Sequence, residues 1–244
     1  MNLVIDVGNT LIKLAVFESS TLKFKKVCLK KDFLKALVQV SDKFENLNNC
    51  ILSSVGALTE NQLLKLKSMF KVQVLTNSTN VPFNNLYATP LTLGVDRIAL
   101  LAAASVKYSR KNVLVIDAGS CITYDFLNNK SEYLGGAISP GTEMRYKALN
   151  NYTAKLPLLN SAVPTKMIGN STATSIHVGI MNGILHEIEG FIDSYKKEYP
   201  DLTVILTGGD LHFLQDRLKN DIFADSNFLL EGLHYILEHN RDSC

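Results

Sequence analysis

The sequence has few cysteines, a small net charge and no long hydrophobic run. Its 244 residues include four cysteines, Cys28, Cys50, Cys121 and Cys244, and none belongs to a CxxC pair. This spacing fits neither a zinc knuckle nor a dense disulfide framework, so we expect four reduced thiols. The formal net charge of +2 gives the whole chain no electrostatic basis for binding nucleic acid.

Signals for membranes and export are also missing from the sequence. No uncharged apolar run reaches the roughly 18–20 residues that a membrane-spanning helix needs. The first ten residues, MNLVIDVGNT, lack the basic stretch and the extended apolar segment of a signal peptide. The sequence therefore predicts a soluble cytoplasmic protein with no membrane partner.

The most informative feature that is present is an internal repeat. LVIDVGNTLIKLAVF at residues 3–17 and LVIDAGSCITYDFL at residues 114–127 align at Asp6 and Asp117, about half a chain apart. Each copy has the pattern of a buried strand, a tight glycine turn and a returning strand, which is a β-hairpin. The repeat predicts two related domains, residues 1–111 and 112–244, within an ordinary globular composition.

Strands and helices alternate between and after the two hairpins, which predicts an α/β protein. The spacing of apolar residues favours helices over residues 31–44, 59–70, 95–108 and 171–198, short strands over 50–54, 72–75 and 203–207, and a further helix from residue 210. The longest helix carries a row of isoleucines at positions 176, 180, 184, 188 and 192. Residues 77–90 are polar and rich in turn formers, so we expect a loop there.

The two Asp-x-Gly turns are candidates for phosphate binding. Backbone N–H groups in a tight glycine turn can cradle phosphate oxygens, while the carboxylate holds a hydrated cation over the same phosphates. Aspartate and glycine are also the commonest turn residues, so either turn alone is consistent with a purely structural role. Approximate two-fold symmetry would bring Asp6 and Asp117 into one cleft, where a metal–nucleotide complex would relieve the repulsion between the carboxylates.

Two further segments could carry chemistry. Thr207-Gly208-Gly209-Asp210 ends a predicted strand in a double glycine, which lets the backbone approach a ligand closely or simply turns the chain into a helix. Gly94-Val95-Asp96-Arg97 opens an alanine-rich helix. There Asp96 could be a helix N-cap, or it could be a general base for a substrate hydroxyl, with Arg97 as an anion clamp.

Two patterns have simpler interpretations. The lysines of residues 23–31 alternate with apolar residues, which favours a solvated strand face over a nucleic-acid patch. Gly179 and Gly183, four residues apart on the long helix, allow close approach of another helix, either within the chain or from a second subunit.

The motifs together resemble those of type III pantothenate kinases, in order and across nearly the whole chain. The resemblance rests on LVIDVGNT at residues 3–10, LGVDR at 93–97, DAGSCITYD at 117–125, AKLP at 154–157, GNSTATSIHVG at 169–179, GGAISPG at 135–141 and TGGD at 207–210. The glycine motifs are shared with the wider superfamily of actin, Hsp70 and sugar kinases. LGVDR combined with GGAISPG points to this family within it.

The resemblance implies duplicated actin-like (ribonuclease H-like) domains with a nucleotide cleft between them, working as a homodimer. It also implies phosphorylation of pantothenate by ATP, the first committed step of coenzyme A synthesis. Mg²⁺ and a monovalent cation, K⁺ or NH₄⁺, would be required. By this resemblance the ATP phosphate loop comprises Asp6, Val7, Gly8, Asn9, Thr10, Leu11, Ile12 and Lys13.

The remaining roles are implied in the same way. Asp96 would be the proton acceptor, Asp117 would bind the monovalent cation and Ser120 would contact the nucleotide. Pantothenate would be contacted by Tyr87, Gly94, Val95, Asp96, Arg97 and, from the partner subunit, Thr172.

Two segments depart from the family pattern. Ser120-Cys121 stands where the family usually has Thr-Ala, which keeps the hydroxyl. Ser53-Ser54-Val55-Gly56 stands where the family often has Ser-Val-Val-Pro, and none of these four residues is expected to take part in the reaction. Two other functions stay open at this point: a non-catalytic regulatory protein of the same fold, and a kinase of the superfamily acting on a sugar or acyl substrate. The charged residues at positions 6, 96, 97 and 117 favour the enzyme over the regulatory protein.

Overall fold

The opening run Leu-Val-Ile is part of a strand that is buried along its whole length. The structure, a computed structural model, describes residues 1–54 and 58–241 of the chain. All six residues of β1 (Asn2–Val7) are buried, which explains why its apolar residues do not alternate with polar ones.

The chain forms two compact units, one of residues 1–109, 131–133 and 227 onwards, the other of residues 110–130 and 134–226.

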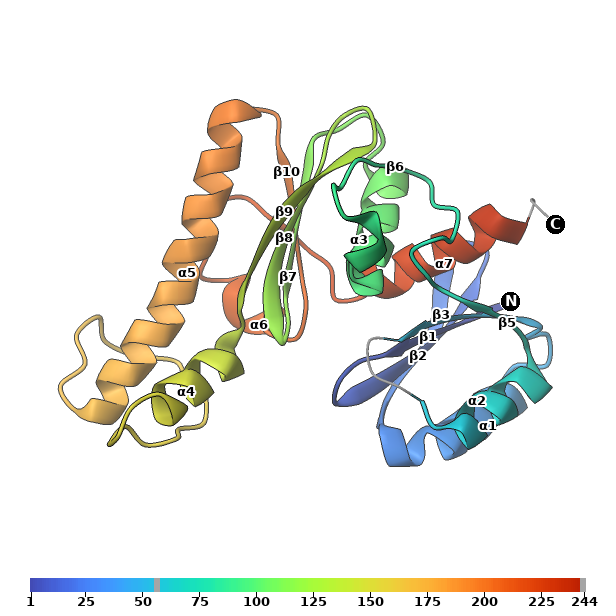
Figure 1. Cartoon of the computed structure of the whole chain (residues 1–244), viewed down its shortest axis with the longest axis horizontal. Helices are drawn as coiled ribbons and strands as arrows, with labels where there is room; N and C mark the ends of the chain where they lie inside the picture. Colours follow the sequence, from blue (N-terminus) through green and yellow to red (C-terminus); the bar gives the residue numbers. More distant parts are fainter. Residues whose placement is uncertain (55–57, 242–244) are drawn as a thin grey trace. The chain divides into compact units, whose positions relative to one another are not determined.

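The first unit is built on a mixed sheet of five strands in the order β3-β2-β1-β4-β5 (Figure 1). The first three strands are antiparallel neighbours, whereas β1, β4 and β5 run parallel. The elements that follow β1 are β2 (Leu11–Glu18), β3 (Thr21–Leu29), α1 (Phe33–Lys43), β4 (Asn49–Ser54), α2 (Glu60–Met69), β5 (Lys71–Val74), β6 (Asn84–Asn85), α3 (Val95–Lys107) and, from the end of the chain, α7 (Phe228–Arg241).

Helices cover both faces of this sheet. Phe33, Leu37 and Val40 of α1 pack into one apolar cluster with alternate residues of β1 and β2. The helices α3 and α7 pack against each other, and both contact β4. Two short 3₁₀ helices, Lys30–Asp32 and Pro90–Thr92, precede α1 and α3.

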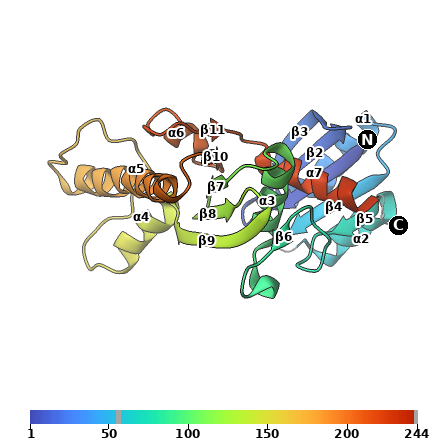
Figure 2. The same ribbon diagram turned by 90° about the horizontal axis from the view of Figure 1, so that it is seen from above.

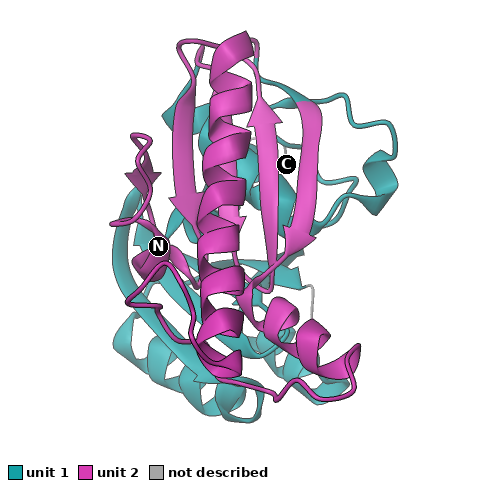
Figure 3. Cartoon of the chain, turned by 90° about the vertical axis from the view of Figure 1, so that its left-hand side faces the viewer, with its two compact units in different colours: residues 1–109, 131–133, 227–244 teal, residues 110–130, 134–226 magenta. Residues whose placement is uncertain are grey.

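The second unit repeats this arrangement, with strand order β9-β8-β7-β10-β11 and β6 joining the free edge of β9. Its long helix α5 lies across one face of the sheet (Figure 3), where its row of five isoleucines is buried in the core. Helix α4 lies beside the N-terminal half of α5 (Figure 2). The elements are β7 (Val113–Ala118), β8 (Cys121–Leu127), β9 (Glu132–Pro140), α4 (Thr142–Asn151), α5 (Thr172–Glu198), β10 (Thr203–Thr207), α6 (Leu211–Leu214) and β11 (Phe223–Ala224).

The predicted hairpins and α/β class are confirmed. In both hairpins the strands pair antiparallel, with Asp6 opposite Lys13 and Asp117 opposite Thr123. The helix expected from residue 210 has only four residues. Elements that sequence reasoning missed are β9, α4, β11, α7 and the short strand β6, which lies within the expected loop of residues 77–90. Most of the basic segment lies in β3, where Lys23 and Lys25 are exposed. Lys26 is partly buried and Val27 and Leu29 are exposed, so the solvated face of this strand is only partly basic.

The units and the predicted domains differ at the C-terminus. The division between residues 111 and 112 places α7 in the second domain, whereas α7 packs on α3 and groups with the first unit. Cys28, Cys50 and Cys121 are free thiols, as predicted. Cys244, Val55 and Gly56 lie outside the described residues. Within the described part of the chain, no helix combines the length and apolar character needed to cross a membrane.

Candidate active site

The turn between β1 and β2 is tight and has an exposed tip. The N–H of Gly8 donates to the Leu11 carbonyl at 3.0 Å, which closes the turn. Val7 and Ile12 are buried and anchor its two ends, while Asn9 and Thr10 at the tip are exposed. Backbone amides at an exposed turn of this kind can meet an anionic ligand.

Asp6 lies at the base of this turn and is only 6% exposed. The Lys13 Nζ lies 3.5 Å from the Asp6 carboxylate, across the hairpin. Burial is the largest influence and raises the pKa of Asp6; Lys13 opposes it, and the negative charge of Asp96 adds to it. Burial opposes the charged form of this carboxylate, and a bound cation would stabilise that form. Asp6 is therefore suited to a cationic ligand.

Asp96 is placed at the start of α3 and is half-buried. The N-cap of this helix is Gly94, so the interpretation of Asp96 as the N-cap is wrong. Its Oδ1 accepts a hydrogen bond from the backbone N–H of Arg97 at 2.9 Å. A Cβ on Gly94 would lie 2.4 Å from that same oxygen, so glycine leaves room for the carboxylate. Asp96 can therefore act as a base held on a rigid helix.

Arg97 is almost completely buried, with 6% of its surface exposed. Its Nη2 donates to the hydroxyl of Tyr133 at 2.7 Å, and its guanidinium lies 5.7 Å from the ring centroid of Tyr87. The structure thus brings together Tyr87 and Arg97, two of the residues expected to contact substrate. Sequence reasoning missed Tyr133. The signal available was its place two residues before the double glycine of GGAISPG.

In the second unit, three glycine segments meet around the end of β7. Gly208 has a φ of +102°, and a Cβ there would lie 2.4 Å from the Ala118 carbonyl and 2.5 Å from Asp117 Oδ1. A Cβ on Gly141 would lie 2.4 Å from the carbonyls of Gly119 and Ser120. The glycine at position 208 therefore lets this backbone segment lie close to the Asp117 turn of the same chain.

Hydrogen bonds fix these segments to one another. The N–H of Asp210 donates to the Ala118 carbonyl at 2.9 Å, and the N–H of Gly141 donates to the Ser120 carbonyl at 3.2 Å. The Thr142 hydroxyl donates to Asp210 Oδ2 at 2.6 Å. Ser120 at the tip of the turn is exposed, which suits contact with a nucleotide.

The donors around Asp117 fit a cation of the kind expected. The Asp117 carboxylate and the Ala118 carbonyl both lie within 2.5 Å of a Cβ built on Gly208, and oxygens of these kinds are the ligands that hard cations prefer. Among the residues that the structure describes, no group of three or more His, Cys, Asp or Glu side chains could hold a metal. A cation at this turn would therefore complete its coordination with phosphate oxygens, backbone carbonyls and water.

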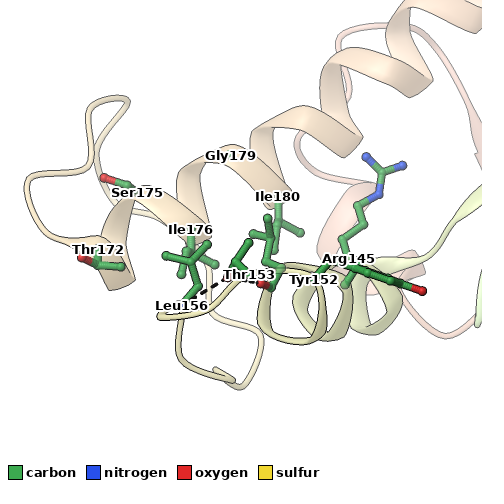
Figure 4. A pocket seen from close by; sticks show the side chains of 11 residues that line it. Arg145, Tyr152, Thr153, Leu156, Thr172, Ser175, Ile176, Gly179 and Ile180 are labelled. Carbon is green, nitrogen blue, oxygen red and sulfur yellow. Dashed lines mark hydrogen bonds between the residues drawn. The ribbon is translucent and has the colours of Figure 1, made fainter.

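Thr172 is the first residue of α5. It is exposed and lines a groove of about 910 Å³ between α4 and α5, with Leu149, Leu156, Ile176 and Ile180 among its apolar walls (Figure 4). Thr172 belongs to the second unit, whereas the other residues expected at the substrate all belong to the first unit.

Comparison with known proteins agrees with these features. Residues 2–194 match the sequence pattern of the type III pantothenate kinases. The chain belongs to the type III pantothenate kinase family. It is 53% identical to the type III pantothenate kinase of Christiangramia forsetii, with 99% of each chain covered. It is 47% identical to that of Flavobacterium johnsoniae, with both chains covered in full.

Solved structures add agreement at the level of the fold. A Campylobacter jejuni protein named for the Baf family of transcriptional activators matches with a TM-score of 0.65 and 24% identity, covering 98% of this chain and 99% of the other. A Listeria monocytogenes protein named as an N-acetylmannosamine kinase matches with a TM-score of 0.51 and 10% identity, at the same coverage. This chain thus has the actin-like α/β fold, with two mixed sheets.

Proposed function

We propose that this chain transfers the γ-phosphoryl group of ATP to the primary hydroxyl of pantothenate. Membership of the type III pantothenate kinase family carries this proposal. The arrangement in the first unit supports it, because a phosphate-binding turn, a carboxylate base and a buried arginine lie on elements of one sheet and its helix. The charged residues Asp6, Asp96, Arg97 and Asp117 are all present, which favours an enzyme over a regulatory protein of the same fold.

In the proposed reaction, Asp96 orients the pantothenate hydroxyl and accepts its proton as the oxygen attacks the γ-phosphorus. Phosphoryl transfer through a loose transition state needs little proton abstraction, so orienting the hydroxyl is the larger part of this role. The backbone amides of Asn9 and Thr10 and the Lys13 ammonium bind phosphate oxygens. Arg97 holds the substrate as an anion clamp, with Tyr87 beside it, and Gly94 and Val95 supply the neighbouring backbone.

The cation requirement is part of the proposal. Mg²⁺ bound to ATP neutralises charge that develops on the phosphates. Asp6 and the oxygens around Asp117 fit Mg²⁺–ATP and a monovalent cation, K⁺ or NH₄⁺, respectively. Ser120 contacts the nucleotide from the second turn. We propose that the enzyme works in the cytoplasm, in keeping with its free thiols.

The direct test is the identity of the acceptor. Purified protein is incubated with ATP, Mg²⁺ and K⁺ and with pantothenate, N-acetylmannosamine or glucose, and the products are identified by mass spectrometry. We expect 4'-phosphopantothenate and no sugar phosphate. Phosphorylation of a sugar with pantothenate inert would replace the proposed substrate, and no phosphorylation of any acceptor would favour a non-catalytic protein.

We also propose a homodimer in which Thr172 reaches the pantothenate site of the partner subunit. The apolar groove beside Thr172 supports this, as do exposed apolar side chains nearby: Tyr152 is 88% exposed and Ile168 is 81% exposed. Among the described residues, nothing lies within 4 Å of a Cβ built on Gly179 or Gly183. That face of α5 is therefore open to a helix from a second subunit.

A further inference from the structure

The reaction proposed above assigns no role to Tyr133, although this residue makes a buried contact with Arg97. An arginine cannot lose its charge in a protein, so burying it demands polar partners and fixed geometry. Tyr133 supplies a hydroxyl at 2.7 Å from Nη2, and its ring centroid lies 6.0 Å from the guanidinium. Because the phenol is neutral, this hydrogen bond orients the guanidinium without adding a formal negative charge.

Tyr133 is itself held rigidly. Its side chain is completely buried, with the ring of Tyr87 stacked on it at 5.6 Å and the ring of Phe83 edge-on at 6.5 Å. Its backbone is fixed as well: it pairs with Asn85 of β6, and its carbonyl accepts from the Leu86 N–H at 3.0 Å. The hydroxyl is therefore a fixed point that holds the guanidinium.

The same contacts join Tyr133 to both expected substrate residues. Tyr87 comes from the segment between β6 and α3, whereas Arg97 comes from the first turn of α3. Tyr133 touches both, so a displacement of its ring would move the two together. A guanidinium recognises a carboxylate through paired donors in one plane, and this recognition depends on orientation.

We propose that Tyr133 is a positioning residue that holds Arg97 in the orientation needed to bind the carboxylate of the substrate. This inference rests on the proposed function, since pantothenate supplies that carboxylate. Tyr133 makes no contact with substrate in this account. It sets the preference of the enzyme for an anionic substrate over a neutral analogue of the same shape.

The test compares pantothenate with its alcohol analogue, in which CH₂OH replaces the carboxylate, for the wild type and Tyr133→Phe. The variant removes one oxygen and keeps the ring contacts. We expect the KM for pantothenate to rise about 10-fold, as for the loss of one hydrogen bond to a charged group. The KM for the alcohol, the KM for ATP and kcat should change less than about 3-fold, so the preference for the acid falls.

The matched control is Tyr124→Phe. Tyr124 is also fully buried, and its hydroxyl donates to Glu187 at 2.9 Å in the second unit. This variant should lose thermal stability yet keep the wild-type preference for the acid. If Tyr133→Phe does not fold, Tyr133→His provides the test, because its ring nitrogen lies nearer the backbone than the phenolic oxygen and cannot replace it.

The outcomes separate the two proposals. A wild type that phosphorylates neither compound overturns the proposed function. A wild type that prefers pantothenate, with a folded Tyr133 variant that keeps the same preference, overturns the positioning role alone. An equal rise in KM for the acid and the alcohol would also overturn it, because a general loss of packing would act on both.

Discussion

At the scale of single residues, the molecule keeps several titratable groups in surroundings that oppose their charge. Burial raises the pKa of Asp6, and Lys13 only partly compensates. His234 on α7 lies outside the proposed chemistry. It is 1% exposed, stacks on Phe17 at 4.5 Å, and its Nδ1 has no hydrogen-bond partner among the described residues.

Burial lowers the pKa of His234 below its usual value of 6.5, although Glu238 opposes the effect and Arg241 and the chain N-terminus add to it. The folded protein therefore keeps this histidine neutral while the unfolded chain takes up a proton as the pH falls through about 6.5. The free energy of unfolding should decrease from pH 7 to pH 5, by at most about 1.4 kcal/mol per pH unit for one proton.

Urea denaturation of the wild type and His234→Phe at several pH values measures this effect. The variant keeps an aromatic ring against Phe17 and should show a flatter dependence between pH 7 and pH 5. Glu238, whose pKa is lowered by hydrogen bonds from Arg241 and Asn2 despite its burial, loses its contribution only below about pH 4.5. An unchanged slope in His234→Phe would show that another group titrates in this range.

The roles of individual residues differ in how far the sequence reveals them. Asp6, Asp96 and Arg97 stand in motifs that predict their proposed roles, and the structure places Asp6 and Arg97 in buried positions and Asp96 in the first turn of α3. Tyr133 carries no motif of its own. Its importance comes from contacts between β9, α3 and the segment before α3, and a pattern along the chain cannot show which distant side chains meet.

At the scale of elements, glycines set how closely backbones pack. Gly232 of α7 faces α3: a Cβ there would lie 1.8 Å from the Ala99 carbonyl oxygen and 2.6 Å from its carbon. Gly190 of α5 provides the contrast, because nothing described lies within 4 Å of a Cβ built on it. Both glycines are inside helices, where alanine is favoured by about 1 kcal/mol when space allows.

Thermal denaturation of Gly232→Ala and Gly190→Ala separates packing from helix propensity. We expect Gly232→Ala to destabilise the protein by about 1–3 kcal/mol, since backbone atoms must shift. Gly190→Ala should stabilise it by up to about 1 kcal/mol. At this chain length each 1 kcal/mol corresponds to roughly 2–4 °C in Tm. Similar shifts for both variants would mean that α3 and α7 do not pack this closely.

Elements with strong local patterns could be predicted, and those without them could not. The hairpins and α5 follow from apolar periodicity and glycine turns. The strand β9 has two consecutive glycines and a proline at its end, which weaken any strand pattern, and α4 has few apolar residues. Both are stabilised by neighbours: Gly136 approaches the Tyr124 carbonyl too closely for a side chain, and Tyr146 of α4 is buried in the core.

At the scale of the whole molecule, duplication of one unit organises the chain. The order β3-β2-β1-β4-β5 recurs as β9-β8-β7-β10-β11. By this correspondence α7 follows β11 as α3 follows β5, yet it packs on α3. The repeated hairpins predicted the duplication. The packing of α7 with the first unit depends on tertiary contacts with α3. A division of the sequence at residue 111 could not predict those contacts.

The proposed dimer makes a prediction about mixed subunits. Asp96→Asn should be inactive, and Thr172→Val should raise the KM for pantothenate. If Thr172 serves the partner's site, a heterodimer of the two variants contains one complete site, which combines Asp96 of one subunit with Thr172 of the other. Co-expressed variants, assayed at low pantothenate, should therefore exceed the summed activity of the separate proteins. Activity equal to that sum would place Thr172 in its own subunit's site or outside any site.

The most direct test of the account is the rate of ADP release by Asp96→Asn, with and without pantothenate, beside the wild type. The account predicts that wild-type release depends on pantothenate, Mg²⁺ and K⁺ or NH₄⁺. It also predicts that the variant loses about 10²–10⁴-fold in kcat, or roughly 3–5 kcal/mol of barrier, while binding ATP normally. Turnover by Asp96→Asn within a few-fold of the wild type would contradict the role of Asp96 as the base.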